Sequence, residues 1–127
     1  MKAITLWRPW PWAIFFAGKD IENRTWEPPK GLIGQRLAIH AGKRFDPEAV
    51  AYLQELGFEC PERPDDHPLG LVGTVTYSGA VRSSTSEWFE GSVGWQLADP
   101  HKLEIPLEVS GKQGLWPVPD ELARLLF

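Results

Sequence analysis

Alternating apolar and polar residues predict a series of short strands along the chain. In residues 2–6, KAITL, the alternation places Ile4 and Leu6 on one face, because side chains two positions apart in a strand point the same way. Such a segment presents one apolar side to a core. The same reasoning, with glycines interrupting some segments, predicts further strands at residues 21–26, 36–40, 69–81, 94–97, 103–109 and 114–118.

Three other segments have the features of short helices. Residues 9–18 begin at a proline, are apolar on most sides and end at Gly18, which suits a left-handed cap. Residues 47–56 follow Asp46, a favourable N-cap residue, and carry a buried stripe of leucine, valine and alanine. Residues 119–127 form a leucine-rich segment that can pack against the sheet.

About six short strands and three short helices predict an α+β fold. The glycines at positions 70, 73 and 79 interrupt the longest strand, as bulges and sharp coiling do where a sheet closes. Closure would remove exposed strand edges. We therefore expect a small mixed β-barrel with short helices packed outside it. A length of 127 residues fits one domain, residues 1–127.

The composition narrows the functional classes. The chain is 43% hydrophobic and 24% charged, as is usual for globular domains. Its single cysteine, Cys60, excludes an internal disulfide and fits a cytoplasmic location. The sequence shows no signal peptide and no membrane span. No spacing of His, Cys, Asp and Glu is typical of a metal site, so neither a metal nor another cofactor is expected.

Charge is unevenly distributed along the chain. Residues 1–44 hold eight Lys and Arg against three Asp and Glu, a balance of +5, and residues 45–127 hold five against fourteen, a balance of −9. The net charge of −4 argues against bulk non-specific binding to nucleic acid. The basic first third can form a local anion-binding face or consist of scattered surface charges.

Residues 18–26, GKDIENRTW, concentrate the candidate chemistry. In a strand, Glu22, Arg24 and Trp26 share one face, and Lys19 precedes the strand where it can reach over that face. If the face is buried, the carboxylate and the guanidinium must pair. Cations, a carboxylate and an indole in one cleft suit an anionic planar ligand such as a nucleotide. The alternative is a solvated sheet face with a weak ion pair.

Four further residues are candidates, and three of them, His40, Lys43 and Arg44, also have a plainer interpretation. His40 follows a strand and could contact a base or act as a general base, or simply bond to the backbone at the mouth of the barrel. Lys43 and Arg44 follow a glycine and could hold a phosphate, or be an unengaged exposed pair. Trp7 and Trp26 border the charged stretch and are candidates for base stacking. The sequence leaves open whether Trp88, Trp95 and Trp116 pack in the barrel or line its mouth.

Four segments together resemble the ASCH family of the PUA-like superfamily: ITLWRPWPWAIFFAGKDIENRTW, LAIHAGKR, GLVGTVTYSGAV and GWQLADPHKLEIPLEVSGKQGLW. The resemblance extends from Lys2 to about Pro119. Its most specific part is a Gly-x-Lys-x-x-Glu-x-Arg type motif, which Lys19, Glu22 and Arg24 match. The glycine of that motif falls on Ala17, beside a glycine in this chain.

The resemblance implies a PUA-like barrel with a cleft between barrel and helices, and RNA or a modified nucleotide or nucleoside as the partner. Our leading hypothesis is a nucleic-acid-binding module for single-stranded RNA or a modified nucleobase. Its binding residues would be Trp7, Lys19, Glu22, Arg24, Trp26, His40, Lys43 and Arg44.

The alternative is a small hydrolase, either a ribonuclease or an amidohydrolase of the acetylcytidine type, with Lys19 and Glu22 as catalytic residues. Here the chain departs from the family, because the hydrolases carry a threonine where this chain has Glu22. Their catalytic glutamate has no clear counterpart, and Glu87 and Glu90 are candidates. A third hypothesis, a protein-binding adaptor, has little support because no large apolar surface is evident from the sequence.

Overall fold

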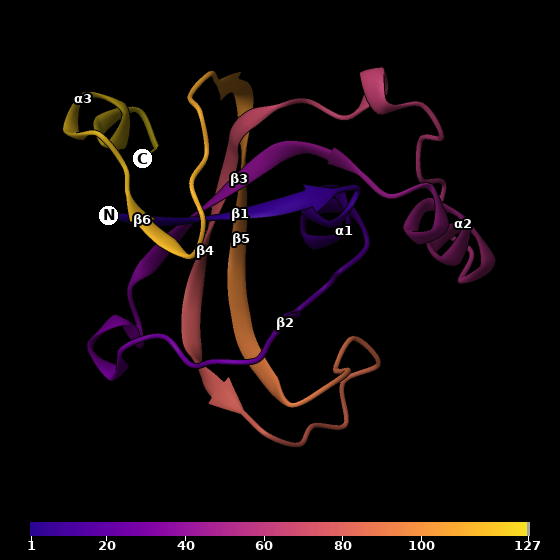
Figure 1. Ribbon diagram of the computed structural model, residues 1–127, viewed down its shortest axis with the longest axis horizontal. Coiled ribbons are helices and arrows are strands. Elements are labelled where there is room, and N and C mark those ends of the chain that lie inside the picture. The colour runs from indigo at the N-terminus through magenta and orange to yellow at the C-terminus, as the bar shows by residue number, and fades with distance from the viewer. Residues whose placement is uncertain (127) are drawn as a thin grey trace.

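The computed structural model describes residues 1–126 and contains one six-stranded mixed sheet with short helices around it (Figure 1). The strands are β1 (Lys2–Arg8), β2 (Ile21–Arg24), β3 (Arg36–Phe45), β4 (Gly70–Val81), β5 (Val93–Leu107) and β6 (Leu115–Pro117). The α-helices are α1 (Trp10–Phe16), α2 (Pro47–Glu55) and α3 (Asp120–Ala123). Single 3₁₀ turns lie at η1 (Lys30–Leu32), η2 (Pro64–Asp66) and η3 (Arg124–Leu126).

The strand order in the sheet is β2-β5-β4-β3-β1-β6. β1 and β3 are parallel, and every other neighbouring pair is antiparallel. The α+β class and the six strands are therefore confirmed. Within residues 1–126 no strand pairing joins β2 to β6, so the sheet is open and the closed barrel predicted from the sequence is not formed by strand pairing.

The sheet curls around one apolar core. Residues from four strands meet there, among them Ile4 of β1, Ile39 of β3, Val75 of β4 and Trp95 of β5. Each is at most 1% exposed. Because four strands contribute to the same cluster, the curled sheet surrounds its core on more than one side, and β2 continues the same curve at one edge.

Apolar clusters also cover the outer face of the sheet. α1 and α2 enclose a group that includes Ala13, Val50 and Leu53, together with Ile21 of β2. The side chain of Asp46 caps α2 by accepting hydrogen bonds from the next helical amides, at 3.0 and 3.3 Å, as the sequence predicted. A third cluster joins the C-terminal segment to β1, β3 and β4.

Several boundaries differ from those predicted. β5 is one strand that runs through both residues 94–97 and residues 103–109 up to Leu107. The sequence predicted two separate strands there, with Pro100 in the segment between them. The positive φ of Asp99, 48°, and shifts in the β4–β5 register allow the strand to bend there while pairing continues.

β3 is also longer than predicted and includes residues 41–45. The predicted loop is a strand because β1 pairs with it as far as Arg8 and Phe45, across one irregularity in the register. β2, by contrast, ends at Arg24. The C-terminal helix is split into α3 and η3, and the end predicted for it, Phe127, lies outside the described residues.

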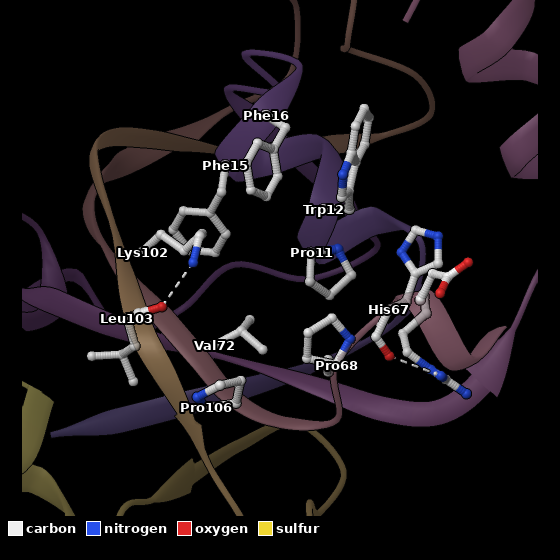
Figure 2. Close-up of a pocket in the computed structure, with 13 residues that line it drawn as sticks. Pro11, Trp12, Phe15, Phe16, His67, Pro68, Val72, Lys102, Leu103 and Pro106 are labelled. Carbon is white, nitrogen blue, oxygen red and sulfur yellow. Dashed lines mark hydrogen bonds between the residues drawn. The ribbon is translucent and has the colours of Figure 1, made fainter. Parts of the chain in front are cut away.

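A pocket of about 250 Å³ has α1 on one side, and on the other side the start of β4 and the second half of β5 (Figure 2). Aromatic side chains of α1 form one wall. None of the helices in residues 1–126 combines the length and the apolarity that crossing a membrane would require.

Candidate functional site

The charged residues of the predicted motif lie on β2 and on the turn before it. α1 ends and Gly18, with φ of 72°, turns the chain so that the Lys19 amide bonds to the Ala13 carbonyl. In the pairing of β2 with β5, Glu22 lies opposite Trp95 and Arg24 opposite Val93, and opposite residues share a face of the sheet. Glu22 and Arg24 therefore point to the core side, the arrangement in which the sequence required them to pair.

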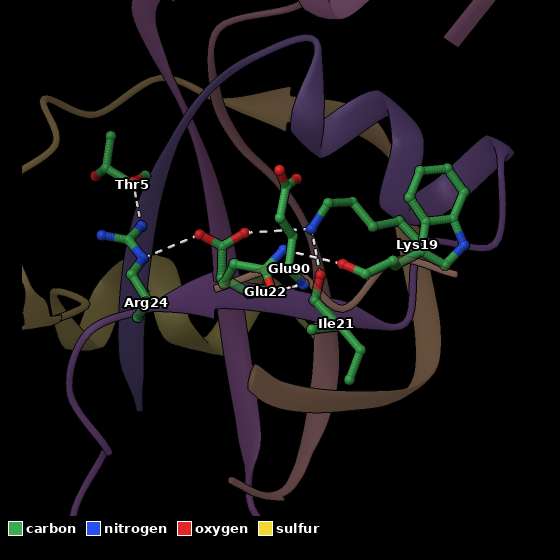
Figure 3. A network of polar contacts seen from close by, with 8 residues as sticks. Thr5, Lys19, Ile21, Glu22, Arg24 and Glu90 are labelled. Atoms are coloured by element: carbon green, nitrogen blue, oxygen red, sulfur yellow. Dashed lines mark hydrogen bonds and ion pairs between the residues drawn. The ribbon is translucent and has the colours of Figure 1, made fainter. Parts of the chain in front are cut away.

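Glu22 lies between two cations (Figure 3). Its Oε2 accepts a hydrogen bond from Arg24 Nε at 2.9 Å, and its Oε1 lies 3.5 Å from Lys19 Nζ. The Lys19 ammonium also donates to the carbonyl of Ile21. The three side chains, which we call the Glu22 network, are 5% exposed for Lys19, 12% for Glu22 and 26% for Arg24. One carboxylate against two cations leaves the network with a net positive charge.

Burial changes the ionisation of Lys19. Desolvation lowers the pKa of its amine from the usual value, and the nearby Glu22 carboxylate partly opposes this. The ammonium also lies 5.5 Å from the centroid of the Trp10 ring, where it is attracted by the face of the indole. The amine is thus held by a carboxylate, a carbonyl and an aromatic ring.

Arg24 joins β2 to β1 at the opening of the sheet. β6 pairs with β1 only over Lys2 to Ile4, and one guanidinium nitrogen of Arg24 donates to the carbonyl of the next residue, Thr5, at 3.3 Å. A side chain therefore connects the two strands where the sheet is open. Arg24 is the most exposed of the three charged side chains.

Trp7 and Arg44 form a second group at the ends of β1 and β3, and Lys43 precedes Arg44 on β3. Trp7 is 49% exposed, and the guanidinium carbon of Arg44 lies 4.9 Å from the centroid of its ring. Both basic residues are exposed. They lie on a strand rather than in the predicted loop, and the sequence did not indicate the contact between Arg44 and Trp7.

Trp26 lies just beyond β2 and is 38% exposed. Its ring packs edge-on against Trp95, with centroids 4.9 Å apart, and Trp95 Nε1 donates to its carbonyl at 2.9 Å. Trp95 is fully buried, and Trp88 and Trp116 are also buried. The two tryptophans proposed for stacking, Trp7 and Trp26, therefore have accessible rings. The three whose placement the sequence left open pack in the apolar cores.

His40 lies apart from the Glu22 network, on the face of β3 opposite the core residue Ile39. It is 4% exposed. Its Nε2 donates to the carbonyl of Val109 at 2.7 Å, so in the neutral ring Nδ1 accepts from the Thr5 hydroxyl at 3.2 Å. Trp116 Nε1 donates in turn to that hydroxyl at 3.1 Å. Burial lowers the pKa of the imidazole. The arrangement is that of a structural histidine, the plainer of the two interpretations.

The loop before β5 is held to β2 through Glu90 and Asn23. The backbone N–H of Glu90 donates to the side chain of Asn23 at 2.8 Å, and Asn23 donates to the Trp88 carbonyl at 2.9 Å. The Glu90 side chain is exposed, and Figure 3 includes it with the residues of the network. The sequence had suggested Glu90 only through the resemblance. It gave no indication that Asn23 would bond to the loop before β5, or that Thr5 would accept a hydrogen bond from Arg24.

A smaller pocket of about 210 Å³ reaches Lys19 from the turn that precedes β2, between that turn and the bend of β5. Within residues 1–126 there is no group of three or more His, Cys, Asp and Glu side chains placed to hold a metal ion.

Comparison with known proteins does not assign the chain to a family. A scan against protein-family models finds no match, and a search of curated proteins finds no significant relative.

Proposed function

We propose that the protein is a nucleic-acid-binding module that recognises single-stranded RNA or a modified nucleobase. The observation that carries the proposal is the half-exposed Trp7 ring with the Arg44 guanidinium over it, two residues along β1 from the Thr5 carbonyl that Arg24 holds. An aromatic ring beside cations is what single-strand binding uses, since a base stacks on the ring while the cations attract phosphate.

The Glu22 network supports the same proposal. Glu22 fixes Arg24 in one orientation while leaving part of its guanidinium exposed, and the exposed Trp26 follows two residues later. Two cations of the basic first third, Arg8 and Lys19, are buried and so do not face phosphates. We therefore expect a short binding site rather than a long basic track. The proposal includes a relationship to the ASCH family and its PUA-like barrel, with Arg24 bridging the opening between β2 and β1.

The test is binding of a fluorescent RNA of about eight nucleotides to the wild type and to single variants. Trp7→Ala should weaken binding about 5- to 100-fold, the range that corresponds to one stacked base. Arg44→Gln should weaken it less and reduce the salt dependence by about one charge. Tyr52→Ala, which removes an exposed ring on α2, and Lys112→Gln, an exposed lysine, are matched controls that should bind as the wild type does.

The total slope of log affinity against log salt should correspond to about two to four phosphates. Binding that is insensitive to salt, or equal losses in Trp7→Ala and Tyr52→Ala, would contradict the proposal. Unlabelled modified nucleosides, added as competitors, separate recognition of a base from recognition of a strand.

A second candidate function, hydrolysis of RNA or of a modified nucleoside, is favoured by one observation, the lowered pKa of the buried Lys19 amine next to Glu22. The variant Lys19→Met retains the volume and stem of the side chain. If the protein is a hydrolase, this variant should lose turnover of RNA or acetylated nucleosides and keep most ligand binding. If the protein only binds, prolonged incubation of the wild type yields no product.

A further inference from the structure

The pocket between α1 and the sheet, which we call the α1 pocket, is separate from the Glu22 network, since none of the three network residues lines it. Its lining is mainly aromatic rings and prolines (Figure 2). These are Trp12, Phe15, Phe16, Pro11, Pro68 and Pro106. Prolines have no backbone N–H, so the donors in the lining are side chains, among them those of Trp12, Arg8 and Lys102.

Arg8 lines the same pocket and is 8% exposed. Its guanidinium donates to four backbone carbonyls at 2.8 to 3.1 Å, those of Gly42, Lys43, Pro64 and His67. Among residues 1–126 it forms no ion pair with a carboxylate. Carbonyl dipoles satisfy most of its N–H groups, but the positive charge in the pocket wall has no counter-charge paired with it.

A second cation stands at the opening. Lys102 is exposed, and its ammonium donates only to the carbonyl of Leu103, at 2.9 Å. The one carboxylate in the lining, Asp66, is already paired with Arg63 at 3.3 Å. The pocket thus combines an apolar interior with an excess of positive charge.

We propose that the α1 pocket binds a small aromatic carboxylate, with its ring among the aromatic side chains and its carboxylate at the opening on Lys102. The charge of Arg8 in the wall favours the anion. A volume of about 250 Å³ is below the usual range of about 300–1,000 Å³ for ligand sites, so it suits a single ring.

This proposal is independent of the nucleic-acid function and is tested with benzoate and benzamide, which share size and shape but differ in charge. Protein NMR titrations should show benzoate binding more tightly, by about two- to fivefold, with shifts confined to α1 and its neighbours. Lys102→Gln should remove most of that difference and leave benzamide unchanged. Phe16→Ala, at an exposed ring of the wall, should weaken both ligands equally.

Two variants show where the anion binds. Lys112→Gln changes the same charge away from the pocket, and Arg24→Gln removes the exposed cation of the Glu22 network. Neither should affect benzoate binding. Equal affinity for the two ligands, absence of binding to the folded wild type, or loss of benzoate binding in Arg24→Gln with none in Lys102→Gln would each overturn the proposal.

Discussion

The Glu22 network predicts an unequal response to removal of its members. Glu22→Ala deprives two cations of their carboxylate at once. Lys19, only 5% exposed, then retains the Ile21 carbonyl as its hydrogen-bond acceptor, and Arg24 retains the Thr5 carbonyl. Arg24→Ala is milder, because Glu22 remains close to Lys19 at 3.5 Å.

The magnitudes follow from burial. Breaking a fully buried ion pair costs about 3–5 kcal/mol, whereas an exposed pair is worth less than about 1 kcal/mol. Glu22 is 12% exposed and Arg24 is 26% exposed, so both lie between these limits. We expect Glu22→Ala to lower the free energy of unfolding by about 2–4 kcal/mol and Arg24→Ala by about 1–2 kcal/mol. The double variant should lose less free energy of unfolding than the two single variants together, since no Arg24 guanidinium is left without its carboxylate.

The assay is equilibrium unfolding in urea, monitored by tryptophan fluorescence, for both single variants and the double variant. The chain supplies a matched control in Glu27 and Arg82, an ion pair of 3.3 Å whose side chains are 47% and 71% exposed. Its cycle should give a coupling energy close to zero. If Glu22→Ala costs no more than Glu27→Ala, the network is a solvated surface and the reasoning is refuted.

Three other predictions follow from features outside the network. Burial lowers the pKa of His40, so below about pH 6.5 the unfolded chain binds a proton that the folded protein does not, and the free energy of unfolding decreases as the pH is lowered. In urea melts between about pH 7.5 and 5.5, His40→Gln should reduce this pH dependence, whereas His101→Gln, at an exposed histidine, should not. A methyl group at Gly111 would lie 2.5 Å from the Thr5 hydroxyl, whereas one at Gly31 meets nothing within 4 Å. Thermal melts should therefore show that Gly111→Ala lowers the free energy of unfolding by about 1–3 kcal/mol and that Gly31→Ala does not. Burial raises the pKa of the Cys60 thiol to about 11, so iodoacetamide should label it in denaturant, as seen by mass spectrometry, and not in the native protein.

Local patterns predicted the elements of this fold well. The alternation in residues 2–6 and the Asp46 cap both correspond to observed elements. The bend of β5 was missed because Pro100 and Asp99 are ordinary loop residues, and only pairing with β4 keeps them in a strand. Whether a curled sheet closes depends on long-range contacts such as the one from Arg24 to Thr5, which no local pattern encodes.

The candidate site was predictable where spacing alone determines it. The positions of Glu22 and Arg24 on one face follow from the period of a strand, and their pairing follows from burial. The environment of His40 could not be foreseen, because it depends on Val109 and Thr5, which are distant in sequence.

The same limit applies to Trp7. Its contact with Arg44 depends on the parallel pairing of β1 and β3, which the sequence did not reveal.

The most direct test of nucleic-acid binding is an NMR titration that follows the indole N–H signals of the seven tryptophans as a short single-stranded RNA is added. The signals of the exposed Trp7 and Trp26 should shift, and that of the fully buried Trp95 less, while that of Trp116, buried behind Thr5, should stay in place. Trp7→Ala should remove the effect on the remaining signals at the same RNA concentration. Shifts confined to Trp12, in the α1 pocket, or no shifts at low salt would contradict the account.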